Sequence, residues 1–241
     1  MDTSGADSRI RPRMALFGGA FNPLHIGHIA LAEEIERRLG LSDVVFVPTG
    51  HPPHKDPPEV SCEERLRMVE LAIAGRPGWS VSDIECRLPG PSLTARTLER
   101  LALPSLPFFV MGEDAFADFL EWGGPETILS LSHLVVVTRP GAEGARARGT
   151  LLRVLSFAGS LLTDREVPAP DDLRSGRTEE WVAALPAFAT TIRLLTIDSL
   201  ELSSTRLRSD IASGTPETWA HLLPGPVKSY IVEKGLYLKK I

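Results

Sequence analysis

Two histidines near the start of the chain have types and spacing suited to binding phosphate. His25 and His28 are three residues apart, and they close an eleven-residue segment, 18–28, that begins with two glycines and contains a proline. On a helix, residues three apart share one face, so both imidazole rings would point the same way. Imidazole donates hydrogen bonds at modest charge near neutral pH, which suits contact with phosphate oxygens.

The elements around this segment predict where the histidines lie. An apolar run at 14–17 precedes it and a helical pattern at 29–39 follows it, which predicts a strand, a glycine turn and a helix start. The first N–H groups of a helix have no partner within the helix, and they attract anions. Gly18 and Gly19 would let a ligand approach the backbone closely.

The segment matches neither of two common phosphate-binding motifs. The histidine pair, considered without its surroundings, also leaves two other roles open. The segment lacks the Gly-Lys-Ser/Thr end of a Walker loop and the Gly-x-Gly-x-x-Gly spacing of a dinucleotide-binding turn. A histidine pair at this spacing would by itself also suit a structural role or a weak metal site. The combination of strand, glycine pair, proline and histidine pair favours a phosphate site.

Short apolar runs alternate with helical patterns along the chain. The expected strands are 14–17, 44–48, 79–83, 107–111, 134–138 and, as a sixth, about 192–197. The expected helices are 29–39, 63–74, 94–101, 115–121 and 205–213. Continuous apolar strands separated by helices predict a parallel sheet covered on both faces, and therefore an α/β, Rossmann-like, doubly wound fold.

The 241 residues are enough for one domain that carries an insertion. Residues 1–12 lack apolar periodicity, which predicts a disordered tail before a single domain over 13–241. The pattern weakens over 141–190, and we interpret this segment as an insertion packed on the sheet edge. Within it, 181–185 is expected to form a short helical turn.

The composition favours a cytoplasmic enzyme. Apolar residues make up 43% and charged residues 24% of the chain, as in ordinary globular proteins. The net charge of −5 argues against a broad nucleic-acid surface, and no apolar stretch is long enough to span a membrane. Cys62 and Cys86 predict neither a disulfide framework nor a Cys-x-x-Cys metal site. The oligomeric state stays open, a homo-oligomer included.

Two motifs resemble those of a known superfamily. Residues 18–28 resemble the Gly-Gly-x-Phe-x-Pro-x-His-x-Gly-His motif of the nucleotidylyltransferases. Residues 203–208 are similar to their Ser-Ser-Thr-x-Ile-Arg motif, with Leu207 in place of isoleucine. The order of the segments between them resembles that of the bacterial nicotinate-mononucleotide adenylyltransferase family; these segments are 52–55, 92–98, 112–114 and 133–141. The resemblance covers about 14–139 and 192–238, and it implies one nucleotidylyltransferase domain.

The resemblance implies transfer of the adenylyl group of ATP to nicotinate mononucleotide, forming nicotinate adenine dinucleotide and pyrophosphate in NAD biosynthesis. His25 and His28 would be the catalytic contacts, with His28 nearest the transition state. Ser204 and Thr205 would cap the helix that follows them while contacting phosphate. The implied ATP-binding residues are Gly18, Gly19, Ala20, Phe21, His25, His28, Gly112, Asp114, Arg139, Ser204, Thr205 and Arg208. Mg²⁺ would arrive with the ATP, held by phosphates and water, without a protein-built metal site.

The acceptor site implied by the resemblance uses other segments. Its residues would be Asn22, His54, Lys55, Leu93, Thr94 and Trp122. The helix start at 92–94 would bind the nicotinate carboxylate through free N–H groups. The family often has tyrosine at the position of Leu93, and a smaller or neutral residue at that of Glu113.

Three of these residue roles have alternatives that stay open. The segment with His54 and Lys55 closes over the triphosphate, or it is a rigid surface connection. Trp122 stacks on the pyridine ring, or it belongs to the core. Arg139 faces the adenine, or it caps the sheet.

Three competing functions also stay open. The first keeps the superfamily and changes the acceptor to nicotinamide mononucleotide, phosphopantetheine or a cytidylyl-transfer substrate. The second is a metallohydrolase that uses His25, His28, His51 and His54. The third is a non-catalytic nucleotide-binding module. Pyrophosphate release from ATP with a panel of acceptors separates them.

Overall fold

One seven-stranded sheet organises the part of the chain that the computed structural model describes, which is residues 14–52, 58–138, 145–162, 164–169, 172, 179–198 and 202–238. The strands lie in the order β3-β2-β1-β4-β5-β7-β6, and neighbours are parallel except for β6 and β7. Their bounds are β1 Met14–Gly19, β2 Asp43–Pro48, β3 Trp79–Val81, β4 Phe108–Gly112, β5 His133–Thr138, β6 Glu180–Leu185 and β7 Thr190–Thr196. The predicted α/β, doubly wound sheet is confirmed.

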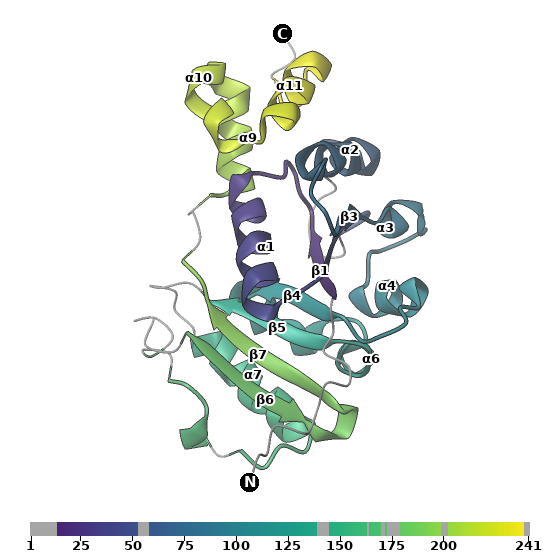
Figure 1. The fold of residues 1–241 in the computed structure, drawn as a ribbon, viewed down its shortest axis with the longest axis vertical. Helices are drawn as coiled ribbons and strands as arrows, with labels where there is room; N and C mark the ends of the chain where they lie inside the picture. Colours follow the sequence, from purple (N-terminus) through teal and green to yellow (C-terminus); the bar gives the residue numbers. More distant parts are fainter. Residues whose placement is uncertain are drawn as a thin grey trace.

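Helices cover both faces of this sheet (Figure 1). The α-helices are α1 Ile26–Leu39, α2 Cys62–Ile73, α3 Ile84–Arg87, α4 Thr94–Leu101, α5 Glu113–Ala117, α6 Pro125–Leu131, α7 Ala145–Phe157, α9 Ser204–Ser213, α10 Pro216–Trp219 and α11 Gly225–Lys234. Single 3₁₀ turns lie at η1 Phe119–Glu121, η2 Asp164–Glu166, η3 Pro186–Phe188 and η4 Ala220–Leu222. The helix predicted at 115–121 is therefore two short elements, α5 and η1.

The alternation of side chains along each strand divides the core into two layers. In β1, Ala15 and Phe17 pack in one apolar cluster with α1 and α2, whereas Leu16 belongs to the cluster on the opposite face. In β4, Val110 joins the first cluster and Phe109 joins the second. Successive strand residues point to opposite faces, so a strand buried on both sides is apolar throughout.

A third apolar cluster joins the last helices to α2. Met68 of α2 packs with Leu207 of α9, Trp219 of α10 and Ile231 of α11. Figure 1 shows α9, α10 and α11, in yellow-green to yellow, gathered at one end of the molecule above the first residues of α1. The C-terminal segment is thereby held close to the start of α1, where the sequence predicts a phosphate site.

The segment 141–190 differs in two ways from its sequence interpretation. Residues 181–185 were expected as a helical turn, but they lie in β6, a strand antiparallel to β7. Their buried residues, Ala183 and Leu185, are two apart, which is the period of a strand. Helix α7 was not predicted, because the apolar periodicity is weak in this segment. It buries Leu151 and Val154 against the sheet. The predicted tail at 1–12 lies outside the described residues, and the insertion boundaries stay a prediction.

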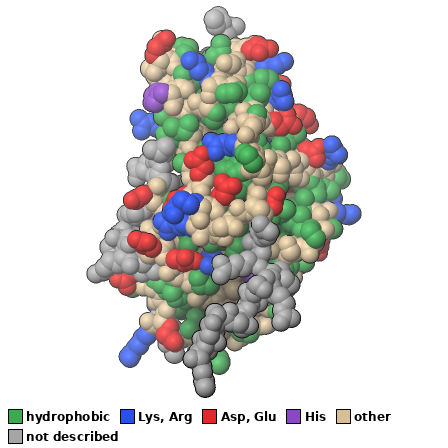
Figure 2. Space-filling view, viewed as in Figure 1, with side chains coloured by type: hydrophobic (Ala, Val, Ile, Leu, Met, Phe, Trp, Pro, Cys, Tyr) green, Lys and Arg blue, Asp and Glu red, His purple; other side chains and the backbone are tan. Residues whose placement is uncertain are grey.

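Charged side chains of both signs are interspersed on the face of the molecule that Figure 2 shows. This mixture accompanies the net charge of −5 for the whole chain. Within the described residues, no helix combines the length and the apolar character needed to cross a membrane.

Candidate active site

The strand order reverses between β1 and β4. From β1 the chain continues outward to β2 and β3, and it then returns to place β4 on the other side of β1. Loops at the carboxyl ends of parallel strands diverge at such a reversal and leave a crevice. A cavity lies there, lined by Gly18 and Gly19 at the end of β1 and by Gly112 at the end of β4. A Cβ atom added to Gly112 would meet nothing within 4 Å, so there is room for a ligand.

The two histidines meet at the start of α1. His25 is the N-cap residue and is 4% exposed, whereas His28, in the first turn, is half-buried. Their rings stack with centroids 3.7 Å apart, and the His25 backbone N–H donates a hydrogen bond to Nδ1 of His28 over 3.2 Å. An accepting Nδ1 in a neutral imidazole leaves the ring proton on Nε2. His28 therefore offers Nε2–H as a donor.

The Phe21 ring lies against both His28 and Gly19, and Gly19 lines the cavity. The Phe21 φ of 45° lies in the left-handed region, which is uncommon for a bulky residue and occurs where surrounding contacts impose it. The buried ring packs edge-on against His28, with centroids 5.3 Å apart, and edge-on against Phe46 of β2. The loop after Gly19 thus carries the histidines beside the cavity, although neither imidazole belongs to its lining.

Distant segments hold this loop by hydrogen bonds. The carbonyl oxygen of Ala20 accepts from Nη1 of Arg65 over 2.6 Å. The carbonyl oxygen of Asn22 accepts from Nη1 of Arg208 over 2.8 Å. The side-chain oxygen of Asn22, a predicted acceptor contact, accepts from the Tyr237 hydroxyl over 2.7 Å. In this structure the Asn22 side chain therefore supports the loop.

The second motif lies at the start of α9, against the same loop. The cap is Ser203, whose hydroxyl accepts from the N–H three residues on, so the predicted capping by Ser204 and Thr205 is wrong. The helix begins one residue earlier than expected, which frees both hydroxyls from capping. Ser204 instead donates to the carbonyl of Pro23 over 3.2 Å, and Oγ1 of Thr205 accepts from Nη2 of Arg208 over 3.3 Å.

A polar network forms the opposite wall of the cavity. Oγ of Ser92 accepts from the N–H groups of Gly50 and His51, each over 3.0 Å. A Cβ on Gly50 would overlap the carbonyl of Glu85, so glycine is required there. Glu85 is 8% exposed and accepts from the Thr97 hydroxyl over 2.7 Å. Burial raises the pKa of the Glu85 carboxyl, and hydrogen bonds from Thr97 and Ser92 partly oppose this.

The predicted acceptor residues of α4 lie beside this network. Helix α4 begins at Thr94, and its N-cap residue is Leu93. The apolar side chain of Leu93 forms no capping hydrogen bond with the first N–H groups of the helix. Thr94 and Trp122 line the cavity, while Leu93 is not part of the lining. The half-buried Trp122 ring also packs edge-on against Phe109 of β4, with centroids 6.5 Å apart. Trp122 therefore packs against the core and also lines the cavity, and its stacking on a pyridine ring stays a prediction.

Several predicted residues remain without a described contact. His54, Lys55 and Arg139 lie outside the described residues. Asp114 is exposed in the first turn of α5, directly after Gly112. Among the residues that the structure describes, no group of three or more histidine, cysteine, aspartate or glutamate side chains is arranged to hold a metal ion.

Sequence reasoning missed Arg65 and Tyr237, which hold the loop by hydrogen bonds, and Glu85, which lines the cavity. A signal for Arg65 is present in the sequence, because it shares the apolar face of α2 with Met68 and Val69, three and four residues further on. A cation within an apolar stripe has to find polar partners when it is buried. Glu85 and Tyr237 have no comparable local signal.

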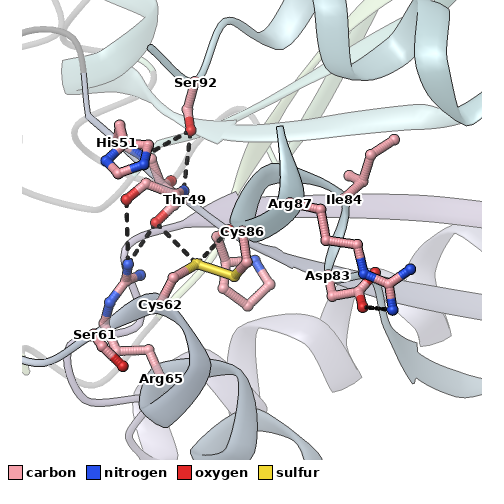
Figure 3. Close-up of a disulfide and its surroundings, with 12 residues drawn as sticks. Thr49, His51, Ser61, Cys62, Arg65, Asp83, Ile84, Cys86, Arg87 and Ser92 are labelled. Atoms are coloured by element: carbon pink, nitrogen blue, oxygen red, sulfur yellow. Dashed lines mark hydrogen bonds and ion pairs between the residues drawn. A yellow bond between two sulfur atoms is a disulfide. The ribbon is translucent and has the colours of Figure 1, made fainter. Parts of the chain in front are cut away.

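The sequence predicted no disulfide framework from the two cysteines, whereas the structure pairs them. Cys62, the first residue of α2, and Cys86 of α3 form a disulfide with Cα atoms 5.5 Å apart (Figure 3). Because β2 and β3 are neighbours in the sheet, the connections after them bring these residues together across 24 positions. Figure 3 shows the bridge between Arg65 and Asp83, below Thr49 and Ser92. It therefore ties two helices that support the site.

Comparison with known proteins defines the class to which this fold and site belong. A model of the cytidylyltransferase-like family matches residues 16–210. This match covers more than half of the chain, so the chain belongs to that family.

Similar relatives share one description. A protein of Desulfatibacillum aliphaticivorans, described as a probable nicotinate-nucleotide adenylyltransferase, is 36% identical over 94% of this chain and 100% of its own length. A protein of Aeromonas hydrophila subsp. hydrophila with the same description is 37% identical over 95% of this chain and 98% of its own length. The solved structure of Plasmodium falciparum nicotinic acid mononucleotide adenylyltransferase complexed with NaAD covers 94% of this chain and 98% of that chain, with a TM-score of 0.60. Because its sequence is 15% identical to this chain, the likeness supports the fold alone.

Proposed function

We propose that this protein transfers the adenylyl group of ATP to nicotinate mononucleotide, forming nicotinate adenine dinucleotide and pyrophosphate. The observation that carries the proposal is the stacked imidazole pair at the start of α1, beside the cavity at the strand-order reversal. The shared description of relatives that match nearly the whole chain supports the choice of acceptor.

The chemistry requires alignment and charge stabilisation. An oxygen of the acceptor phosphate forms a bond to the α-phosphorus of ATP, and the bond from that phosphorus to the departing pyrophosphate oxygen breaks. The attacking oxygen is already an anion, so no general base is required. Donors aimed at the phosphoryl oxygens stabilise the charge that develops there. We assign this role to Nε2–H of His28, whose orientation follows from the bond that Nδ1 accepts.

The ATP side of the site is assigned to the two motifs. Gly18 and Gly19 leave the end of β1 open to the nucleotide, and the start of α9 supplies Ser204, Thr205 and Arg208. The guanidinium of Arg208 is oriented by its bonds to the carbonyl of Asn22 and the hydroxyl of Thr205. A planar fork of N–H donors matches phosphate oxygens. We therefore assign Arg208 to the β- and γ-phosphates.

We also propose that Mg²⁺ enters with ATP, bound to phosphate oxygens and water. The groups that we assign to ATP at the starts of α1 and α9 are imidazole and guanidinium donors, which suit phosphate oxygens better than Mg²⁺. The cytoplasm, where ATP is available, is the compartment that we propose for the reaction.

Pyrophosphate release tests the proposed function. The purified protein is incubated with Mg²⁺ and ATP, with nicotinate mononucleotide, nicotinamide mononucleotide or phosphopantetheine as the acceptor, and CTP replaces ATP in a parallel series. We expect release with ATP and a pyridine mononucleotide. If the folded protein releases pyrophosphate with neither pyridine mononucleotide, the proposal is wrong, and release with phosphopantetheine or CTP would assign another acceptor or donor.

Replacing Arg208 with alanine should raise the KM for ATP with little change in kcat. Its guanidinium would contact phosphates in the ground state and the transition state alike, and such uniform binding appears in KM. Arg206→Ala is the matched control, because this arginine lies on the same helix with its side chain 86% exposed. A collapse of kcat at an unchanged KM would show instead that Arg208 acts on the transition state.

A further inference from the structure

We propose that Arg65 is a positioning residue that sets the spacing between the ATP half and the acceptor half of the site. The inference rests on the proposed function, because it assumes that two bound nucleotides react with each other. Its basis is the set of carbonyl oxygens that this one side chain holds.

Arg65 bonds to both segments that leave the central strands. Nη1 donates to the carbonyl of Ala20 over 2.6 Å, on the loop that leads to the histidines. Nη2 donates to the carbonyl of Thr49 over 2.7 Å, with a longer contact of 3.5 Å to that of Gly50. Nε donates to the carbonyl of Val60, just before α2, over 3.2 Å. Figure 3 shows the Arg65 side chain reaching up from α2 toward Thr49.

These two segments separate at the edge of the cavity. β1 and β2 are paired from Met14 with Asp43 to Gly19 with Pro48, and the N–H of Thr49 then donates to the carbonyl of Gly19. Beyond that bond, one segment turns toward α1 and the other toward Ser92. Arg65 spans the point of separation, so that its planar guanidinium fixes one segment relative to the other.

Burying the charged side chain of Arg65 costs free energy, and the hydrogen bonds to these carbonyl oxygens offset that cost. This side chain is 0% exposed, and among the described residues no carboxylate forms an ion pair with it. Burial lowers the pKa of the guanidinium, which nevertheless stays protonated because arginine does so in proteins. An isolated buried charge is costly, and an apolar side chain such as that of Met68 would pack without that cost. The four acceptors that Arg65 contacts among the described residues are all backbone oxygens, and three of them lie on the two separating segments.

Each half of the site also has supports of its own. Arg208 and Tyr237 hold the ATP loop at Asn22, and Ser92 holds the acceptor wall at Gly50. Loss of the Arg65 contacts should therefore leave each substrate able to bind while changing the distance between them. Displacement of one reactant by about 1 Å can cost on the order of 100-fold in rate.

The test compares Arg65→Lys and Arg65→Gln with the unaltered protein. A lysine ammonium keeps the charge but lacks the planar fork, so it cannot hold both segments in the same geometry. We expect kcat to fall on the order of 100-fold in both variants, with each KM within about threefold of its original value. Equilibrium binding of a non-hydrolysable ATP analogue alone, and of nicotinate mononucleotide alone, should be retained.

Arg67→Gln is the matched control, because Arg67 lies on the same helix, is exposed and pairs with Glu70 over 2.8 Å. It should keep the original kcat. A folded Arg65 variant with an unchanged kcat overturns the inference. Variants that lose binding of both substrates, or that do not fold, overturn it as well, because Arg65 would then serve general stability.

Failure of the proposed function is distinguishable, because it appears in the unaltered protein. If that protein uses another acceptor, the same comparison is made with that acceptor, since the inference concerns the spacing of the two halves. If it releases no pyrophosphate with any acceptor, the proposed function and this inference fall together.

Discussion

Replacing His28 with alanine should lower kcat by about 10²–10³ while changing ATP affinity much less. A donor directed at charge that develops in the transition state has about this effect on rate when it is removed. The hydrogen bond from the His25 N–H to Nδ1 of His28 makes Nε2–H the donor in question. Steady-state kinetics with saturating acceptor measure kcat, and binding of an ATP analogue measures affinity.

The control for this variant is His221→Ala, because His221 is an exposed histidine in η4. Its kcat should equal that of the unaltered protein. An unchanged kcat in His28→Ala would leave His28 as a residue that only shapes the helix start. Thermal unfolding of both variants identifies any loss of folded protein.

Nicotinate mononucleotide should be preferred over its amide by a factor of roughly ten to several hundred in kcat/KM. The N–H groups at the start of α4, together with the positive end of the helix dipole, favour a carboxylate. A carboxamide would present N–H donors to N–H donors, and each mismatch costs about 1–3 kcal/mol. Trp122 would stack equally on both pyridine rings, and it should therefore leave the preference unchanged.

Glu85 is the feature of the cavity that opposes this preference. Glu85 lines the same cavity, and its ionised form would repel a nicotinate carboxylate. Burial raises the pKa of Glu85, which favours the neutral form, and one of its oxygens already accepts a hydrogen bond from Thr97. Measuring kcat/KM for both acceptors at fixed ATP decides the balance. Equal values would show that the start of α4 does not distinguish the two acceptors.

The sheet and the phosphate loop could be predicted because their signals are local. Continuous apolar runs identified the parallel strands, and the order of glycines and histidines at 18–28 placed both imidazoles at a helix start. Strand β6 was missed because its outward residues include Val182 and Ala184, which hide the polar alternation that usually marks an edge strand.

The partners of the supporting residues could not be predicted, because they are distant in sequence. Arg65 reaches Ala20 across 45 residues, and Cys62 meets Cys86 only because β2 and β3 are neighbours. The Asn22 side chain was assigned to the acceptor from its motif, yet its partner in the structure is Tyr237. Local patterns identify the residues of a motif, whereas the contacts that hold them follow from the fold.

The hydrogen bond from Tyr237 to Asn22 spans 215 residues, and it has a consequence for synthesis on the ribosome. The glycine–histidine loop leaves the ribosome early, together with the first strand, and domains generally begin to fold as they emerge. Its supports from Arg208 and Tyr237 emerge after every strand of the described sheet. A nascent chain that stops after β7 can therefore pair all seven of these strands while its loop still lacks those supports. Competence for catalysis should appear late in translation, after the sheet itself has formed.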